Sequence, residues 1–290
     1  MKKLKVKKAV IPAAGFGTRF LPITKVISKE LLPIIDRPAI EYIVKEAIEA
    51  GIEEILLIIS PHKTEVIDYF KTNNVLEEFL NNKKNYEAIK LINEFKNIKI
   101  DYVIQKEQLG LGHAILHAKE FVKNESFAVL LGDDLFYSDT KPAIKQLIDA
   151  FKTYDGHIIG TMTVPDEDTV KYGICKTLPN QKGPVYELDD FVEKPQPHEV
   201  TSRSAASGRY ILKPIIFKYL ETQSKGKGGE IQLTDAILRS KVDTKLYSFD
   251  LDAKRYDIGS KEGYLKAIVE YSLRRDDLKD KMKEIIKDNS

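Results

Sequence analysis

Short apolar runs alternate with longer amphipathic segments along the first 170 residues. Five runs are nearly continuously apolar and rich in Val and Ile, which is typical of buried strands; they are KKAVIPAA, EEILLIIS, IKIDYVIQ, SFAVLLGDD and HIIGTMTV. Between the first two, residues 39–50 place Ile40, Ile43, Val44 and Ala47 on one face of a helix. This alternation predicts an α/β fold with a Rossmann-like, mostly parallel (mixed) central sheet flanked by helices.

The pattern departs from this alternation in three places. Residues 73–96 are helical and polar, which predicts a helical insertion between strand units. After Tyr172 the strand candidates YGICKT and YELDDFVEKP are joined by the turn LPNQKGP. Residues 260–290 predict a helical extension at the C-terminus. No repeat and no linker interrupts the chain, so residues 1–290 are expected to form a single domain.

Composition narrows the class of protein. The chain is 42% hydrophobic and 31% charged, which is ordinary for a soluble globular protein, and its net charge of +2 gives no bulk attraction to nucleic acid. Cys175 is the single cysteine, so no internal disulfide is possible and a reducing cytoplasm is favoured. No apolar run approaches the length of a membrane span. We therefore expect a cytoplasmic protein that binds neither nucleic acid nor membrane.

The first strand runs into a glycine-containing loop, PAAGFGTRFLPITKVISKELLP. Gly15 and Gly17 match the start of a dinucleotide fingerprint, but Phe20 stands at its third glycine, and Pro22 disfavours an immediate helix. A Walker loop is excluded because no Gly-Lys-Ser/Thr follows. Glycine amides can approach phosphate, and the loop adds candidate phosphate ligands; these are Arg19, Thr24, Lys25 and Lys29. The loop therefore suits a nucleoside triphosphate.

Further polar residues stand where other strands end. Gln105 ends the third strand, and a side-chain amide can bind the paired edge of a pyrimidine. Asp133 and Asp134 end the fourth strand and suggest a hard-cation site, with one ligand expected because alternation sends the two side chains to opposite faces. By the same alternation, Glu193 and Lys194 are expected to point apart.

Eight motifs in order now give a resemblance that covers residues 8–270. After the first loop come EQLGLGHA (107–114), GDD (132–134), YG (172–173), VEKP (192–195), GRY (208–210), GEIQLTDA (229–236) and YDIG (256–259). Together they resemble the nucleotide-sugar pyrophosphorylases, and within them the uridylyltransferase branch. The resemblance implies a glycosyltransferase-A-like nucleotidyltransferase fold. It also implies transfer of a uridylyl group from UTP to glucose 1-phosphate, and a homo-oligomer, either a dimer or a tetramer.

The same resemblance implies a role for each site residue. The catalytic cations would be Arg19, Lys29 and Lys194. The nucleotide would be bound by Ala13, Ala14, Gly15, Gly17, Lys25, Gln105 and Gly110. The sugar would be bound by Asp134, Tyr172, Gly173 and Glu193. Mg²⁺ would be held by Asp133 and Asp257.

Three alternatives stay open at this stage. Ser28 stands where the uridylyltransferase pattern usually has proline, and serine there is similar to the thymidylyltransferases, which would act on dTTP. A non-catalytic nucleotide-binding homologue would keep the fold without the reaction, although the charged motif residues argue against it. A Rossmann-type dehydrogenase is disfavoured by Phe20 and the prolines of the first loop.

Overall fold

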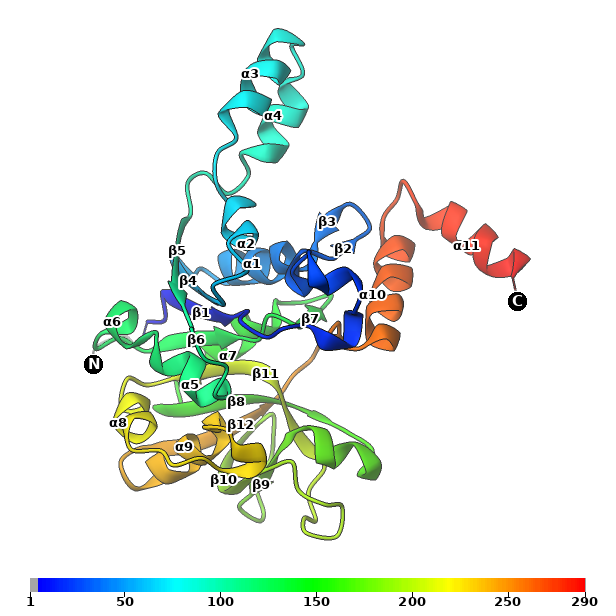
Figure 1. Ribbon diagram of the computed structural model, residues 1–290. Helices are drawn as coiled ribbons and strands as arrows, with labels where there is room; N and C mark the ends of the chain where they lie inside the picture. The colour runs from blue at the N-terminus through cyan, green and yellow to red at the C-terminus, as the bar shows by residue number, and fades with distance from the viewer. Residues whose placement is uncertain (1–4, 290) are drawn as a thin grey trace.

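A nine-stranded mixed sheet organises the protein, of which the computed structural model describes residues 5–289 (Figure 1). The strand order is β5–β4–β1–β6–β11–β8–β12–β10–β9. The strands are β1 Lys8–Pro12, β4 Glu54–Ile59, β5 Lys99–Ile104, β6 Phe127–Leu130, β8 Gly156–Thr163, β9 Gly173–Thr177, β10 Val185–Glu193, β11 Ser204–Leu212 and β12 Lys245–Asp250. Strands β10 and β11 run in the direction opposite to the other seven strands. The predicted fold class is confirmed.

Helices cover both faces of this sheet because the strand side chains alternate between two apolar clusters. In β1, Ala9 and Ile11 point to one cluster and Val10 to the other, and all three are fully buried. The first cluster is covered by α1 Ala39–Glu49, α7 Ala143–Phe151 and α10 Lys261–Arg274. The second is covered by α5 Leu111–Leu116, α6 Lys119–Val122, α8 Ile216–Glu221 and α9 Leu233–Arg239.

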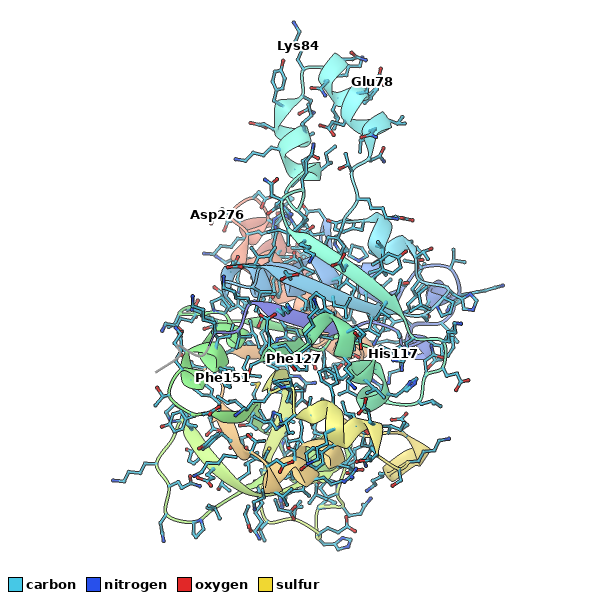
Figure 2. All side chains as sticks on the ribbon, turned by 90° about the vertical axis from the view of Figure 1, so that its left-hand side faces the viewer. Glu78, Lys84, His117, Phe127, Phe151 and Asp276 are labelled. Atoms are coloured by element: carbon cyan, nitrogen blue, oxygen red, sulfur yellow. The ribbon has the colours of Figure 1, made fainter. Side chains whose placement is uncertain are left out.

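Two helical segments extend away from the sheet (Figure 1). After α2 Glu65–Asp68, the helices α3 Asn74–Asn82 and α4 Tyr86–Ile92 form a projecting pair, with Glu78 and Lys84 at its far end (Figure 2). After α10, the chain continues into α11 Lys279–Asp288. None of the described helices is long and apolar enough to span a membrane. Six short 3-10 turns complete the helical part: Thr18–Phe20, Ile23–Lys25, Lys29–Leu31, Asp166–Lys171, Lys227–Gly229 and Ser240–Val242.

Two small two-stranded sheets lie beside the main sheet. Strand β2 Pro33–Ile34 pairs with β3 Arg37–Pro38. Strand β7 Asp134–Tyr137 pairs antiparallel with β13 Lys254–Asp257, and this register sets Asp257 opposite Asp134. The second pairing therefore brings a carboxylate from late in the chain to the end of β6.

A buried ion pair ties this region to the helical layer. Arg209 of β11 is fully buried and binds both carboxylate oxygens of Glu46 in α1, the shortest contact being 2.7 Å. Its guanidinium also donates 2.8 Å to the carbonyl of Asp134. Glu46 accepts a further bond from the amide of Ile144, at the start of α7. Every charge of the pair is thus hydrogen-bonded, as burial requires, and the position of Asp134 is fixed.

A buried histidine makes the stability of this fold depend on pH. His157 in β8 is fully buried, and its Nδ1 accepts a 3.0 Å hydrogen bond from the backbone N–H of Lys213. Burial, together with the charge of Lys213, lowers the pKa of His157 to about 3. The unfolded chain binds this proton near pH 6.5, so between pH 6.5 and 3 the unfolded state holds more protons, and stability falls as the pH drops. We expect this group to cost about 2 kcal/mol of unfolding free energy between pH 7 and pH 5.

The measurement is urea unfolding at the two pH values, with His157→Asn as the comparison. Asparagine keeps an acceptor for the Lys213 amide but does not titrate. The variant should therefore lose about 2 kcal/mol less than the wild type over this interval. An equal loss in both proteins would contradict the assignment.

Candidate active site

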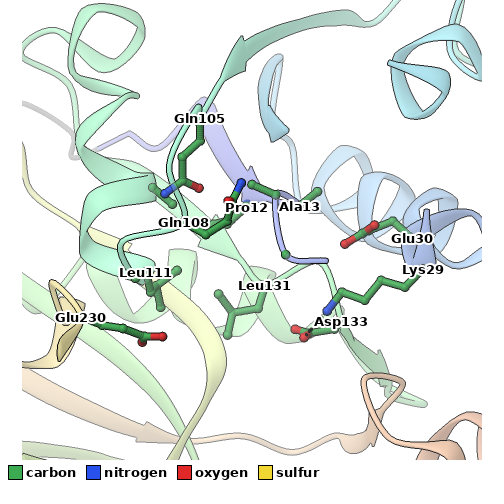
Figure 3. A pocket seen from close by; sticks show the side chains of 14 residues that line it. Pro12, Ala13, Lys29, Glu30, Gln105, Gln108, Leu111, Leu131, Asp133 and Glu230 are labelled. Carbon is green, nitrogen blue, oxygen red and sulfur yellow. Dashed lines mark hydrogen bonds and ion pairs between the residues drawn. The ribbon is translucent and has the colours of Figure 1, made fainter. Parts of the chain in front are cut away.

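Two adjoining cavities open at the carboxyl ends of β1, β5 and β6. The first has a volume of about 310 Å³ (Figure 3). It is lined by Pro12, Ala13, Ala14, Gly15, Lys29, Glu30, Gln105, Gln108, Gly110, Leu111, Ala114, Leu131, Asp133 and Glu230. The second has a volume of about 630 Å³ and shares Leu111, Leu131, Asp133 and Glu230 with the first. The two cavities form one crevice, at the sheet edge where α/β proteins bind their ligands.

The second cavity gathers residues from opposite ends of the chain. Arg19, Asp133, Lys194 and Asp257 all line it, although they are separated by as many as 238 positions. Tyr172, Gly173 and Glu193 line it as well. The sequence-predicted cations and carboxylates therefore share one space.

A charged centre forms where the cavities meet. Lys29 Nζ lies 2.7 Å from Asp133 Oδ2 (Figure 3). Burial acts to raise the pKa of Asp133, but Lys29 and then Arg255 outweigh it, so the pKa is held below its usual value and the side chain is ionised. A Cβ on Gly259 would lie 3.2 Å from Asp133 Oδ2 and 3.0 Å from Asp257 Oδ1. The carbonyl of the same glycine accepts a 3.5 Å bond from Arg19.

Asp134 lies in the second cavity, but its carboxylate is already engaged. It is 3% exposed, and its Oδ1 accepts 2.7 Å and 2.6 Å contacts from the guanidinium of Arg255. Burial raises the pKa of Asp134 to about 6 against the opposing charge of Arg255. Arg255 in turn stacks over the ring of Tyr172 at 4.8 Å. The predicted contact of Asp134 with the sugar therefore has a competitor in Arg255, which itself lines the second cavity.

Gly208 in the GRY motif leaves room for that carboxylate. Its φ is +81°, and a Cβ there would lie 2.4 Å from Asp134 Oδ2. We expect Gly208→Ala to lower the unfolding free energy by ~2–4 kcal/mol, because backbone strain and a steric clash add. Gly228 is the matched control, since its φ is +73° but nothing lies within 4 Å of its Cβ position. Gly228→Ala should cost only about 1 kcal/mol in the same urea titration; equal losses would contradict the steric argument.

The sugar-side residues lie around the end of β10. Glu193 Oε2 accepts a 2.5 Å bond from Thr234, and a Cβ on Gly173 would lie 3.1 Å from the same hydroxyl. Lys194 was expected to point away from Glu193, and this was wrong: its Nζ lies 3.5 Å from Glu193 Oε1. The cause is the left-handed backbone of Lys194, φ +45°, which ends the strand and breaks the alternation.

Backbone hydrogen bonds join two segments beside the expected nucleobase site. Gly112 donates 2.8 Å to the carbonyl of Ile231, and Ile231 donates 2.7 Å to the carbonyl of Leu109. Gly110 has φ +106°, and a Cβ on it would lie 2.8 Å from the carbonyl oxygen of Ile231. Only glycine fits this turn. These two hydrogen bonds thus join the EQLGLGHA loop to the GEIQLTDA segment across the crevice.

Three loop residues lie away from both cavities. Lys25 is exposed, and Gly17 has a left-handed backbone with φ +67°. The carbonyl of Gly17 accepts a 2.8 Å hydrogen bond from the hydroxyl of Thr24. Neither Lys25 nor Gly17 lines either cavity. Ser28 is buried and its hydroxyl and amide both bond to Glu65 of α2. Ser28 therefore stabilises the packing of the loop. Proline at this position could not make the backbone N–H hydrogen bond to Glu65.

Comparison with known proteins identifies the family of this chain. A model of the nucleotidyl transferase family matches residues 8–273. The chain is 48% identical to the UTP–glucose-1-phosphate uridylyltransferase of Staphylococcus epidermidis, over 98% of each chain. It is 49% identical to UTP–glucose-1-phosphate uridylyltransferase 2 of Staphylococcus saprophyticus, also over 98% of each. The chain belongs to the nucleotidyl transferase family, among its UTP–glucose-1-phosphate uridylyltransferases.

Solved structures agree with this assignment. The UTP-bound UGPase from Acinetobacter baumannii superposes with a TM-score of 0.90 at 37% identity, over 97% of this chain and 99% of that one. A UDP-glucose pyrophosphorylase complexed with UDP-glucose superposes with a TM-score of 0.84 at 40% identity, over 93% of this chain and 100% of that one. A putative glucose-1-phosphate thymidylyltransferase from Bacillus anthracis, 24% identical with a TM-score of 0.70, shares the fold.

This nucleotidyl transferase offers oxygen ligands to a divalent cation. Asp133 Oδ2 and Asp257 Oδ1 lie on the same side of Gly259, and Asp133 already holds a cation, the ammonium of Lys29. Within residues 5–289 no group of three His, Cys, Asp or Glu side chains is arranged to hold a metal ion. Two carboxylates suit a hard divalent cation, which can take its remaining ligands from phosphates and water.

Sequence reasoning missed two polar groups that line the second cavity, Arg255 and Thr234. Arg255 stands two positions before Asp257, and on a strand such residues share a face; that spacing could have indicated it. Thr234 had no comparable signal, because its partner Glu193 comes from another segment of the chain.

Proposed function

We propose that the chain transfers a uridylyl group from UTP to glucose 1-phosphate, forming UDP-glucose and pyrophosphate. The observation that supports this most is that Arg19, Lys29 and Lys194 line one crevice together with the carboxylates of Asp133 and Asp257. A reaction between two anions needs cations on both sides of the reacting phosphorus. The names of the relatives support the choice of UTP over dTTP.

In the proposed reaction, a phosphate oxygen of glucose 1-phosphate attacks the α-phosphorus of UTP in line. A new P–O bond forms as the bond to the β-phosphate oxygen breaks, and pyrophosphate leaves with the electron pair. The attacking phosphate is already anionic near neutral pH, with a second pKa of about 6, so no general base is needed. Catalysis then consists of positioning and charge stabilisation.

Each cation has a part in this scheme. Two unit anions 4 Å apart repel by ~4 kcal/mol at an effective dielectric constant of about 20. Lys194 would hold the attacking phosphate in the second cavity, while Arg19 and Lys29 would bind the departing pyrophosphate. Asp133 and Asp257 would hold Mg²⁺, which when bound supplies further neutralisation of phosphate charge. Glu193 and the backbone at Gly173 would bind the hexose, and Ala13, Gly110 and Gln105 the uracil.

The test is pyrophosphate release across UTP, dTTP, CTP and ATP with several sugar 1-phosphates, each with and without Mg²⁺. We expect the highest kcat/KM with UTP and glucose 1-phosphate, and activity only with the metal. A preference for dTTP would establish the thymidylyltransferase alternative. No release with any pair would leave the non-catalytic alternative.

The remaining expectations about assembly and location are proposals as well. A dimer or tetramer is supported by exposed apolar side chains on the projecting helices, among them Val75, Phe79 and Tyr86. Light scattering on the purified protein would decide the oligomeric state. A cytoplasmic location and a single domain with an insertion at 73–96 also stay proposals.

A further inference from the structure

A histidine lies directly behind the glutamine that ends β5. Gln105 is 3% exposed, and its amide donates 2.8 Å to the carbonyl of Ile59, so its backbone is fixed. Its side-chain Nε2 lies 2.9 Å from Nδ1 of His113, in the first turn of α5. Gln105 lines the first cavity and His113 does not. The histidine therefore contacts the far side of the amide group.

The contacts of His113 determine which of its nitrogens carries the proton. Burial, and then the neighbouring His117, lower the pKa of His113, so the ring is neutral at pH 7 and has one N–H. The backbone of Glu107 hydrogen-bonds this ring in a way that favours protonation, which is the effect of a carbonyl acceptor. Nδ1 already faces the Gln105 side-chain amide, so the nitrogen left for this carbonyl is Nε2, which then carries the single N–H. Nδ1 is left as an acceptor.

That tautomer fixes the orientation of the glutamine amide. An acceptor at Nδ1 must meet the NH₂ group of Gln105, because an amide oxygen in its place would set two lone pairs against each other. The amide oxygen is then directed into the first cavity, with the nitrogen turned away, as Figure 3 shows. A glutamine free to turn over could present either group to a base.

We propose that His113 is a positioning residue that fixes Gln105 with its acceptor toward the nucleobase. The site then takes a pyrimidine whose N3 carries a hydrogen, as in uracil or thymine, and rejects cytosine, whose N3 is itself an acceptor. This inference rests on the proposed function, in which Gln105 faces the base. It makes discrimination against CTP a property of a pair of side chains.

The experiment compares kcat/KM for UTP and for CTP in three variants. His113→Leu removes the acceptor and frees the amide to turn, so the UTP:CTP ratio should fall roughly 10- to 100-fold, mainly through KM. His113→Asn places an amide oxygen near the position of Nδ1, and the ratio should return to within about threefold of the wild type. His117→Leu is the matched control: His117 lies one turn further along α5, its Nδ1 donates to the His113 carbonyl at 2.9 Å, and the ratio should not change.

Two outcomes would overturn the proposal. One is an unchanged ratio in His113→Leu, and the other is an equal loss in His113→Leu and His113→Asn, which would indicate a packing role only. Nitrogen NMR of the wild-type imidazole tests the same point without a variant: a proton on Nε2 is expected, and a proton on Nδ1 would also overturn it.

The proposed function can fail separately. If the wild type released no pyrophosphate from either nucleotide, the transferase assignment would be lost, whereas calorimetric binding of UTP and CTP to the same variants would still test the role of His113. Tighter binding of UTP that His113→Leu abolishes and His113→Asn restores would support the inference. Equal binding of the two nucleotides by the wild type would overturn it.

Discussion

Replacing Lys194 by alanine is expected to lower kcat by ~10²–10³, the size of losing one group that stabilises developing charge. Its ammonium lies in the second cavity, 3.5 Å from the Glu193 carboxylate, and its amide donates 2.9 Å to the carbonyl of Tyr172. Without the ammonium, the attacking phosphate would face Glu193 with no compensating cation. The loss therefore has two causes, missing attraction and added repulsion.

A matched control separates this from a general effect of lysine removal. Lys176 on β9 pairs with Asp189 at 2.8 Å and lies outside both cavities, so Lys176→Ala should leave kcat within about twofold, as expected for an exposed ion pair. The measurement is steady-state pyrophosphate release with saturating UTP and varied glucose 1-phosphate. Turnover near the wild-type rate in Lys194→Ala would end its catalytic assignment. Because alanine tolerates φ +45° no worse than lysine, backbone strain does not confuse the result.

The sheet could be predicted because most of its buried strands have a recognisable local sequence pattern. The apolar runs before Pro12 and Asp133 are buried on both faces, which produces a continuous apolar pattern in the sequence. The run before Gln105 was also expected to be buried, and this was wrong: β5 is an edge strand, and its Tyr102 is 49% exposed. The strand-end rule then placed the candidate residues at one edge. The antiparallel course of β10 and β11 could not be read from the pattern, because strand direction depends on distant pairing.

The parts of the site that local strand patterns could not predict depend on long-range pairing or on unusual backbone. The register of β7 with β13 sets Asp257 opposite Asp134, and no local pattern encodes that partnership. The left-handed conformation of Lys194 reversed the expected direction of its side chain. Lys25 was a plausible phosphate ligand by composition alone, yet the 3-10 turn Ile23–Lys25 leaves it exposed outside both cavities.

Replacing Asp133 by asparagine is expected to lower kcat by ~10²–10³ and to raise the Mg²⁺ concentration needed for half-maximal activity. Asparagine has the shape of aspartate but no charge, so the fold of the β6–β7 turn should be retained. Two interactions change at once: the proposed metal site loses one of its two carboxylates, and Lys29 loses the anion that lies 2.7 Å from its ammonium. In the wild type, a chelator should abolish activity and added Mg²⁺ should restore it.

The Mg²⁺ titration distinguishes these two interactions. If Asp133 acted only by orienting Lys29, then Lys29→Met would reproduce the loss of kcat and Asp133→Asn would leave the Mg²⁺ requirement unchanged; that result would contradict its assignment as a metal ligand. Asp139→Asn is the matched control, because Asp139 lies six positions on, accepts a 2.8 Å bond from Tyr137 and lines neither cavity. If only Asp133→Asn needs more Mg²⁺, the carboxylate at the end of β6 binds the metal. A change confined to Lys29 alters the charge near the phosphates but leaves the metal ligands of the protein unchanged.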